Sequence, residues 1–229
     1  IEASQITDEV LDVLNSSTKM CRHLHIPLQA GDDRILARMR RKYVTAEYAE
    51  KIERIRKVMP EVAITTDVIV GFPGETEEMF RNGYRFMEQM QFSEMHVFPY
   101  SKRSGTPAAR MDGQVDEETK NERVHELIDL SERMQLAYAR RFVGKTLEVI
   151  PERESKSAPG SGWIMGYSDN YLQVEFKGSS EWIGQVCRVK ITEAGVNECK
   201  GEFEGLTDTL PVKGGVADER NISRRPRVS

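Results

Sequence analysis

The sequence predicts a mixed α/β fold, with repeated strand–helix units up to about residue 143 and a small all-β barrel after them. Two observations support this prediction. Segments with strand character alternate with segments of helical spacing, which favours a parallel sheet or part of an α/β barrel. After Gly144, short strand-like runs alternate with Gly, Ser, Asn and Pro, which is typical of a small antiparallel barrel.

The first elements follow from hydrophobic periodicity and helix-capping residues. Residues 7–14 predict a short helix, and residues 21–28 (CRHLHIPL) predict a strand. Asp32 starts the next helix. Thr45 is predicted to cap a further helix, and Pro60 ends it.

The next segments continue the alternation. Residues 62–70 (VAITTDVIV) are β-branched and almost continuously apolar, as expected of a parallel strand that is covered on both faces. Thr76 is the predicted N-cap of a helix, and residues 94–100 predict another strand. A long helix over residues 116–142 is predicted to pack across the barrel or to link two domains.

The chain therefore divides into three predicted parts: an α/β domain over 1–143, a barrel over 144–206 and a flexible basic tail over 207–229. The barrel strands are predicted at 147–150, 163–167, 171–176 and 185–191. The tail ends in NISRRPRVS, which has three arginines and no acidic residue.

Composition excludes several classes of protein. The chain has 38% hydrophobic and 31% charged residues, which is typical of a globular domain. It has neither an apolar stretch of about 20 residues nor a secretory pattern, so we expect a cytoplasmic protein with no membrane partner. Its three cysteines are widely spaced, which favours reduced, unligated thiols over disulfides. The four histidines give no ligand triplet by spacing, so we expect no metal site there.

Charge is unevenly distributed although the net charge is only −4. Residues 34–57 contain nine basic and three acidic residues, and this stretch is either a solvated helical face or a binding surface. The predicted barrel over 144–204 has a net charge of −3. RNA contact there would need a local basic patch, such as Lys177, Arg188 and Lys190.

Three motifs fall where strands end, which is where ligands bind in parallel α/β folds: HIPLQAG (25–31), TDVIVGFPGET (66–76) and HVFPYSKRSGT (96–106). Together with MRRKY and NERVHEL, these motifs resemble the radical S-adenosylmethionine (SAM) methylthiotransferases over about residues 1–150. The amino-acid sequences of these motifs are most similar to those of the group that acts on threonylcarbamoyladenosine in tRNA.

This resemblance implies the C-terminal half of a radical SAM (β/α) partial barrel, which keeps the last three barrel strands, followed by a TRAM barrel that binds tRNA. It implies SAM and 4Fe–4S clusters as cofactors of the full-length enzyme. The C-x-x-x-C-x-x-C cluster motif is absent from this sequence, so we expect a fragment that is inactive alone.

The implied reaction transfers a methylthio group to C2 of threonylcarbamoyladenosine next to the tRNA anticodon, with SAM as methyl donor and radical source. Two alternatives stay open. One is a stand-alone RNA-binding module without catalysis. The other is a methylthiotransferase that acts on isopentenyladenosine in tRNA or on a ribosomal protein.

The resemblance also implies SAM contacts at named positions. The Gln29 amide contacts the SAM ribose, or it forms hydrogen bonds with the backbone of its own loop instead. Arg41, or its neighbour Arg40, pairs with the SAM carboxylate. Asp67 lies in an apolar strand, where an ionised carboxylate needs a partner, and that partner is either the ribose diol or a group of the protein.

Three further positions are implied to contact the adenine. Ile69 supplies an apolar surface, and Gly71 allows the backbone to come close. Phe98 covers the ring, with a core position as its alternative.

Overall fold

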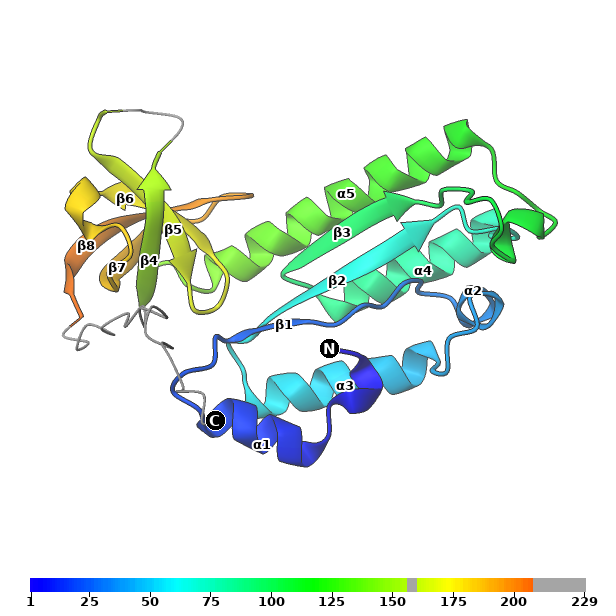
Figure 1. Ribbon diagram of the computed structural model, residues 1–229, viewed down its shortest axis with the longest axis horizontal. Helices are drawn as coiled ribbons and strands as arrows, with labels where there is room; N and C mark the ends of the chain where they lie inside the picture. Colours follow the sequence, from blue (N-terminus) through cyan, green and yellow to red (C-terminus); the bar gives the residue numbers. More distant parts are fainter. Residues whose placement is uncertain (156–159, 208–229) are drawn as a thin grey trace, which may run out of the picture.

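The computed structural model describes residues 1–155 and 160–207, which form a three-stranded parallel sheet with helices and then a closed five-stranded barrel. Figure 1 shows the sheet and its helices in one part of the molecule and the barrel in another, with the helix α5 running between them. The predicted α/β class and the change to an all-β part are therefore confirmed.

The N-terminal part alternates strands with helices, as predicted. Its main elements are α1 (Asp8–Ser16), β1 (His23–His25), α2 (Asp33–Arg38), α3 (Thr45–Val58), β2 (Ala63–Val70), α4 (Glu77–Met90), β3 (Glu94–Pro99) and α5 (Glu117–Arg140). The strands are parallel in the order β1-β2-β3, and helices form the crossovers that parallel pairing requires. A parallel bridge between Gln29 and Val68 extends the pairing beyond β1.

One face of this sheet is buried by helices. Leu24, Ile64 and Val68 on the strands belong to one apolar cluster with side chains of α3, α4 and α5. The helical members of this cluster include Tyr48, Ile52, Phe80, Met87, Leu127 and Leu130. Burying each large apolar side chain contributes about 1.5–3 kcal/mol, so this packing decides which face the helices cover.

The opposite face of the sheet, which we call the open face, carries the side chains of His25, Asp67, Ile69, His96 and Phe98. Successive side chains of a strand point to opposite faces, so Asp67 and Ile69 lie opposite the buried Val68. The expectation that β2 is covered on both faces is therefore wrong at Asp67 and Ile69, which are only partly buried among the described residues.

Side-chain caps start α4 and α5, and the cap at Thr76 was predicted. Thr76 and Asp116 each accept a hydrogen bond from the backbone N–H of the third helical residue, at 3.3 and 2.8 Å. The predicted cap at Thr45 is wrong, because Val44 is the N-cap of α3. The Thr45 N–H instead donates to Asp33 Oδ1 at 2.7 Å, so a side chain from α2 satisfies this helix end.

The long helix α5 both covers the sheet and reaches the barrel, so both predicted roles are correct. Leu127 and Leu130 pack in the sheet core, whereas Tyr138 and the following Phe142 pack in the barrel core. The Tyr138 hydroxyl also donates to the Glu61 carbonyl at 2.9 Å, which attaches this end of the helix to the segment before β2.

The barrel consists of β4 (Thr146–Glu154), β5 (Trp163–Ser168), β6 (Gln173–Lys177), β7 (Cys187–Glu193) and β8 (Cys199–Leu206). It closes in the order β4-β5-β6-β8-β7. Val149, Val174, Phe176, Val189 and Ile191 fill its interior and are fully buried.

Two features of the barrel differ from the prediction. The pair β6·β8 is parallel, so the barrel is not wholly antiparallel. Strand β8 was not predicted, because glycines and acidic residues interrupt its apolar pattern. Gly201 is required there, since a Cβ atom at this position would lie 2.4 Å from Cγ1 of Val189.

The predicted basic tail lies almost wholly outside the described residues, which end at Thr207. Among the helices of the described ranges, none is both long enough and apolar enough to span a bilayer.

Candidate functional site

A pocket of about 260 Å³ lies where β1 and β2 end. Its walls include Gln29, Arg40, Arg41, Ile69, Phe72 and Met111. Ligand pockets are typically about 300–1,000 Å³, so the volume of this one is sufficient for only part of a nucleoside-sized molecule. Three of the predicted SAM contacts, Gln29, Arg41 and Ile69, thus come together in one pocket.

Gln29 is held at the pocket by backbone pairing with β2. Its N–H donates to the Asp67 carbonyl at 2.9 Å, and its own carbonyl accepts from the Ile69 N–H at 2.8 Å. Its φ of 70° is in the left-handed region, which few residues other than glycine adopt. Both backbone groups of Gln29, its N–H and its carbonyl, are therefore bonded to β2, which fixes the position of its Cα atom.

Both candidate arginines line the pocket, so the structure does not choose between them. Arg40 is exposed and has a φ of 58°, and Arg41 Nη1 lies 3.9 Å from Glu2 Oε1. Arg38 supports this wall of the pocket by donating from Nε to the Pro73 carbonyl at 2.8 Å. Only some basic residues of the stretch 34–57 therefore lie at the pocket. Others lie elsewhere on the surface, such as Arg54, which pairs with Asp8 at 3.0 Å.

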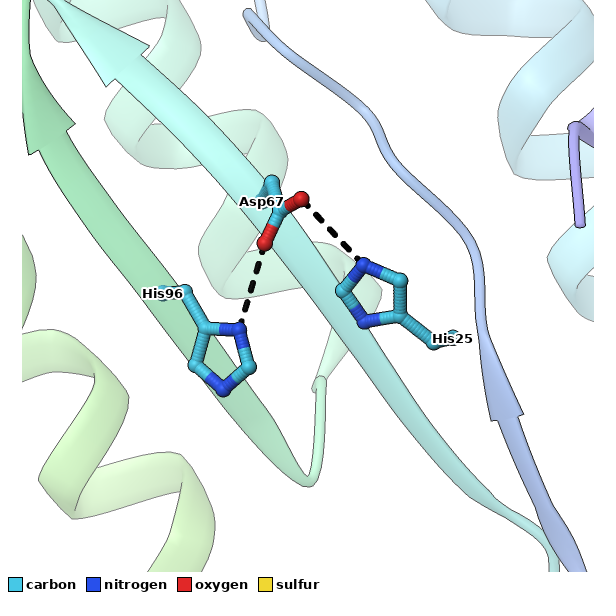
Figure 2. Close-up of side chains that lie close together, drawn as sticks. All are labelled: His25, Asp67 and His96. Atoms are coloured by element: carbon cyan, nitrogen blue, oxygen red, sulfur yellow. Dashed lines mark hydrogen bonds and ion pairs between the residues drawn. The ribbon is translucent and has the colours of Figure 1, made fainter.

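Asp67 lies between two histidines on the open face, as Figure 2 shows. His25 Nε2 on β1 is 3.2 Å from Asp67 Oδ2, and His96 Nδ1 on β3 is 3.2 Å from Asp67 Oδ1. The expectation from sequence spacing was that the histidines form no metal site, but strand pairing brings His25 and His96 to Asp67 from 42 and 29 positions away. Sequence spacing alone carries no signal for this cluster.

Ile69 and Phe98 are register partners on the open face, beyond Asp67 and His96. Phe98 is 51% exposed, so its alternative assignment as a core residue is wrong. An exposed aromatic ring next to an apolar pocket wall is suited to contact with a planar ligand.

Gly71 is not among the pocket residues but faces α5. A Cβ atom added to Gly71 would lie 2.3 Å from Cγ of Lys120, and its φ of 70° also favours glycine. Its N–H donates to Glu75 Oε2 at 2.6 Å. Its requirement for glycine is thus explained by the turn after β2 and by the close approach of α5.

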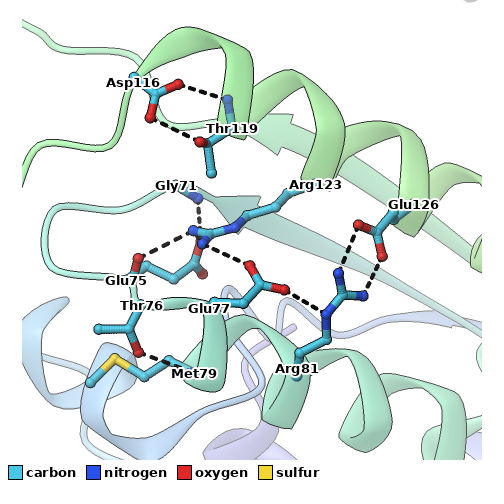
Figure 3. Close-up of polar contacts among 10 residues, drawn as sticks. All are labelled: Gly71, Glu75, Thr76, Glu77, Met79, Arg81, Asp116, Thr119, Arg123 and Glu126. Atoms are coloured by element: carbon cyan, nitrogen blue, oxygen red, sulfur yellow. Dashed lines mark hydrogen bonds and ion pairs between the residues drawn. The ribbon is translucent and has the colours of Figure 1, made fainter.

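That turn is bound to α5 by a buried ion pair, shown in Figure 3. Arg123 Nη1 lies 2.9 Å from Glu75 Oε2, and each side chain is only 6% exposed. Burial raises the pKa of Glu75, although the Gly71 N–H and the Arg123 guanidinium favour its ionised form. Arg123 also contacts Glu77 at 3.3 Å, and Glu77 accepts from Arg81 at 2.6 Å, so the network continues onto the surface.

The structure brings together only two of the three predicted RNA contacts. Arg188 and Lys190 point outward from β7, whereas Lys177 is on β6, and β8 lies between these strands. Acidic residues also surround the pair: Arg188 is opposite Glu148 on β4, and Lys190 is opposite Glu202 on β8. These neighbours reduce the positive potential that phosphate binding needs.

An aromatic stack at the junction of sheet and barrel was missed by the sequence analysis. Tyr171 stacks on His23 with ring centroids 4.1 Å apart and on Tyr167 with centroids 5.1 Å apart. Tyr171 is 46% exposed, and its φ is 63°. Tyrosines in a barrel sequence predict core packing as readily as an exposed stack, so the strand pattern gave no sign of it.

The cysteines do not fit a 4Fe–4S cluster. Cys21 is exposed before β1, whereas Cys187 and Cys199 are buried in the barrel. Such a cluster needs thiolates that converge on one point. The three cysteines of this chain are therefore too far apart to ligate one 4Fe–4S cluster together.

Comparison with known proteins agrees with this architecture. Residues 1–87 match the Radical SAM superfamily, and residues 140–203 match the TRAM domain. The fold resembles that of coproporphyrinogen III oxidase (HemN) from Escherichia coli, a radical SAM enzyme, with a TM-score of 0.50 and 14% identity over 84% of this chain and 45% of that one.

Two curated relatives match most of the chain. It is 52% identical over 203 residues to the threonylcarbamoyladenosine tRNA methylthiotransferase MtaB of Bacillus subtilis, which covers 89% of this chain and 45% of that protein. It is 39% identical over 201 residues to the tRNA-2-methylthio-N(6)-dimethylallyladenosine synthase of Desulfitobacterium hafniense, which covers 86% and 44%. The chain therefore spans less than half the length of either relative.

A parallel sheet with a radical SAM match, joined to a small barrel with a TRAM match, defines a radical SAM protein with a TRAM domain. Within that class, the chain belongs to the radical SAM tRNA methylthiotransferase family. The resemblance inferred from the strand-end motifs is thus confirmed.

Proposed function

We propose that this chain is part of a cytoplasmic enzyme that transfers a methylthio group to C2 of threonylcarbamoyladenosine in tRNA, next to the anticodon. The observation that carries this proposal is the 52% identity to a protein named for that nucleoside. Several relatives named as tRNA-2-methylthio-N(6)-dimethylallyladenosine synthases are 37–41% identical, and the MtaB of Thermotoga maritima is 34% identical. The choice of threonylcarbamoyladenosine as substrate therefore rests on the Bacillus subtilis relative alone.

The strand-end pocket is the proposed site for SAM, which when bound supplies the methyl group and the radical. In this proposal Gln29 contacts the ribose, Arg41 or Arg40 pairs with the carboxylate, and Ile69 packs against the adenine. The pocket supports these roles because it combines guanidinium groups with an apolar wall. Asp67 and Phe98 on the open face, and Gly71 at the end of β2, remain proposed contacts of the same ligand.

Replacing the arginine that holds the carboxylate should weaken SAM binding by about 10- to 150-fold, since a hydrogen bond to a charged group contributes about 1.5–3 kcal/mol. We expect this loss in either Arg41→Ala or Arg40→Ala, as measured by calorimetry. The matched control is Arg54→Ala, which removes an exposed arginine that pairs with Asp8. Equal SAM affinity in all three variants would remove both arginines from the site.

The aromatic stack supports binding of RNA at the junction of sheet and barrel. A base that stacks on an aromatic side chain contributes about 1–3 kcal/mol and needs an accessible ring. Tyr171 is such a ring, and it lies next to His23 at the edge of the sheet. We propose that this junction contacts the tRNA. In this proposal Arg188 and Lys190 on β7 and Lys177 on β6 also contact the tRNA.

Binding of an anticodon stem-loop that carries threonylcarbamoyladenosine tests this function. We expect affinity that falls steeply with salt, because neutralised phosphates release counterions. Tyr171→Ala should weaken binding about 5- to 150-fold, and Tyr171→Phe, which keeps the ring, should not. Gel shifts at several salt concentrations measure both effects.

Comparison RNAs separate the alternatives. Tighter binding of a stem-loop carrying isopentenyladenosine would contradict the proposed substrate. Tight binding of any tRNA by a chain that does not bind SAM would favour a stand-alone RNA-binding module.

A further inference from the structure

We propose that His25, Asp67 and His96 bind a divalent transition-metal ion on the open face of the sheet. The proposed function assigns no metal to these residues, so the inference goes beyond it. The ligand set is two imidazole nitrogens and one carboxylate, a combination that proteins use for zinc and for non-haem iron.

The ligand atoms already lie close to the required positions. One nitrogen of His25, one carboxylate oxygen of Asp67 and one nitrogen of His96 all lie within 4.8 Å of one another. Tetrahedral zinc with ligands at about 2.0–2.2 Å holds its ligand atoms about 3.3 Å apart. Each His–Asp distance is 3.2 Å, but His25 faces Oδ2 and His96 faces Oδ1. One ion between the rings would therefore bind both carboxylate oxygens, or one of them after a rotation of the Asp67 side chain, and the two rings would move closer together.

Strand pairing fixes this arrangement. Asp67 is the register partner of His96, and His25 is the register partner of Thr65, so the three ligands come from neighbouring strands. Figure 2 shows one ring on each side of the carboxylate, with a nitrogen of each ring directed at it. The backbone of a paired sheet moves little, which preorganises the site at low entropic cost.

The second nitrogen of His25 is within hydrogen-bonding distance of a side chain, and that of His96 faces a carboxylate at a longer distance. His25 Nδ1 lies 3.0 Å from Oγ1 of Thr65, and His96 Nε2 lies 3.7 Å from Oε1 of Glu94. Metal-binding histidines usually bond through their other nitrogen to a hydroxyl, carbonyl or carboxylate group, which orients the ring. The two rings here have such neighbours on the side away from Asp67.

The chemistry of the ligands selects the ion. Calcium and magnesium prefer oxygen ligands, so a site with two nitrogens favours zinc, cobalt, nickel or ferrous iron. The side chains of His25, Asp67 and His96 are 35, 32 and 44% exposed. Further positions around the ion are therefore accessible to water or to a ligand.

Titration with Co²⁺, followed by visible absorption, and with Zn²⁺, followed by calorimetry, tests the proposal. All proteins should carry Cys21→Ser, because Cys21 is an exposed free thiol and thiolates are also ligands of these ions. We expect one ion per chain. His25→Ala and His96→Ala should each weaken binding at least about tenfold, as changes in and around metal ligands do. The matched control is His125→Ala, an exposed histidine on α5 that bonds to the Asn121 carbonyl.

The results separate this site from the proposed SAM contact of Asp67. Asp67→Asn should weaken metal binding, whereas His96→Ala should weaken metal binding and leave SAM affinity unchanged. Circular dichroism shows whether each variant is folded. Folded His25→Ala and His96→Ala variants that bind Zn²⁺ as tightly as the His125→Ala control would overturn the proposal, and so would the absence of saturable binding to the starting protein.

Discussion

Arg123→Ala is expected to lower the free energy of unfolding by about 3–5 kcal/mol, the effect of removing one partner from a buried ion pair. Arg123 and Glu75 are each 6% exposed, so water cannot replace the lost guanidinium. The carboxylate of Glu75 would keep the Gly71 N–H as a donor but lose its opposite charge. Urea denaturation measures the change.

A matched surface variant and a double variant make this prediction specific. Arg81→Ala removes an exposed arginine that pairs with Glu77 and Glu126, and it should cost about 1 kcal/mol or less. Adding Glu75→Gln to Arg123→Ala removes the buried charge and should restore part of the loss. Equal costs for Arg81→Ala and Arg123→Ala would contradict the assignment of a buried pair.

The cost of Arg123→Ala should also depend on pH. Burial already holds the pKa of Glu75 above its ordinary value of 4.5, and loss of the guanidinium raises that pKa further. A carboxyl group with a raised folded-state pKa contributes stability below its unfolded pKa and loses that contribution as pH rises through the folded pKa. The deficit of the variant should therefore be small at about pH 4.5 and below, and it should grow as the pH rises through the raised folded-state pKa of Glu75.

Phe142→Ala is expected to destabilise the protein by about 3–5 kcal/mol, because it removes a fully buried ring and leaves a cavity. The ring lies at the base of the barrel, in edge contact with Tyr138 at a centroid distance of 5.1 Å. It shares a core cluster with barrel residues such as Val149 and Ile191. The change should therefore loosen the attachment of the barrel to α5.

The neighbouring Val143→Ala is the matched control. Val143 is 45% exposed, so its truncation should change stability by no more than about 0.5 kcal/mol. Hydrogen exchange shows where the loss occurs, and we expect lower protection in the barrel strands of Phe142→Ala. A variant with unchanged stability would mean that the junction does not depend on this ring.

Much of the fold follows from local patterns. The β-branched run of β2 and the capping side chains of Thr76 and Asp116 each specify their element within a few residues. Thr45 was wrongly assigned as the N-cap of α3; it is the first helical residue, and its N–H donates to Asp33, twelve positions earlier in the chain. Contacts between distant residues are the ones that such patterns omit.

The same limit applies to the candidate site. Gln29, Arg41 and Ile69 were identified from motifs at strand ends, and they do line one pocket. The histidines beside Asp67 were missed, because only the register of three strands brings them together. The order of the barrel strands likewise separates Lys177 from Arg188, which are only eleven positions apart in the sequence.

The helix α5 sets a fixed separation between the two ends of the molecule. Its 24 residues include neither glycine nor proline, at which helices commonly bend, and at about 1.5 Å per residue they span about 36 Å. One end is bound to the turn after β2 through Arg123, and the other is buried in the barrel through Tyr138. One unbroken helix is thus attached at both ends, so the turn after β2 and the core of the barrel are held at a fixed separation.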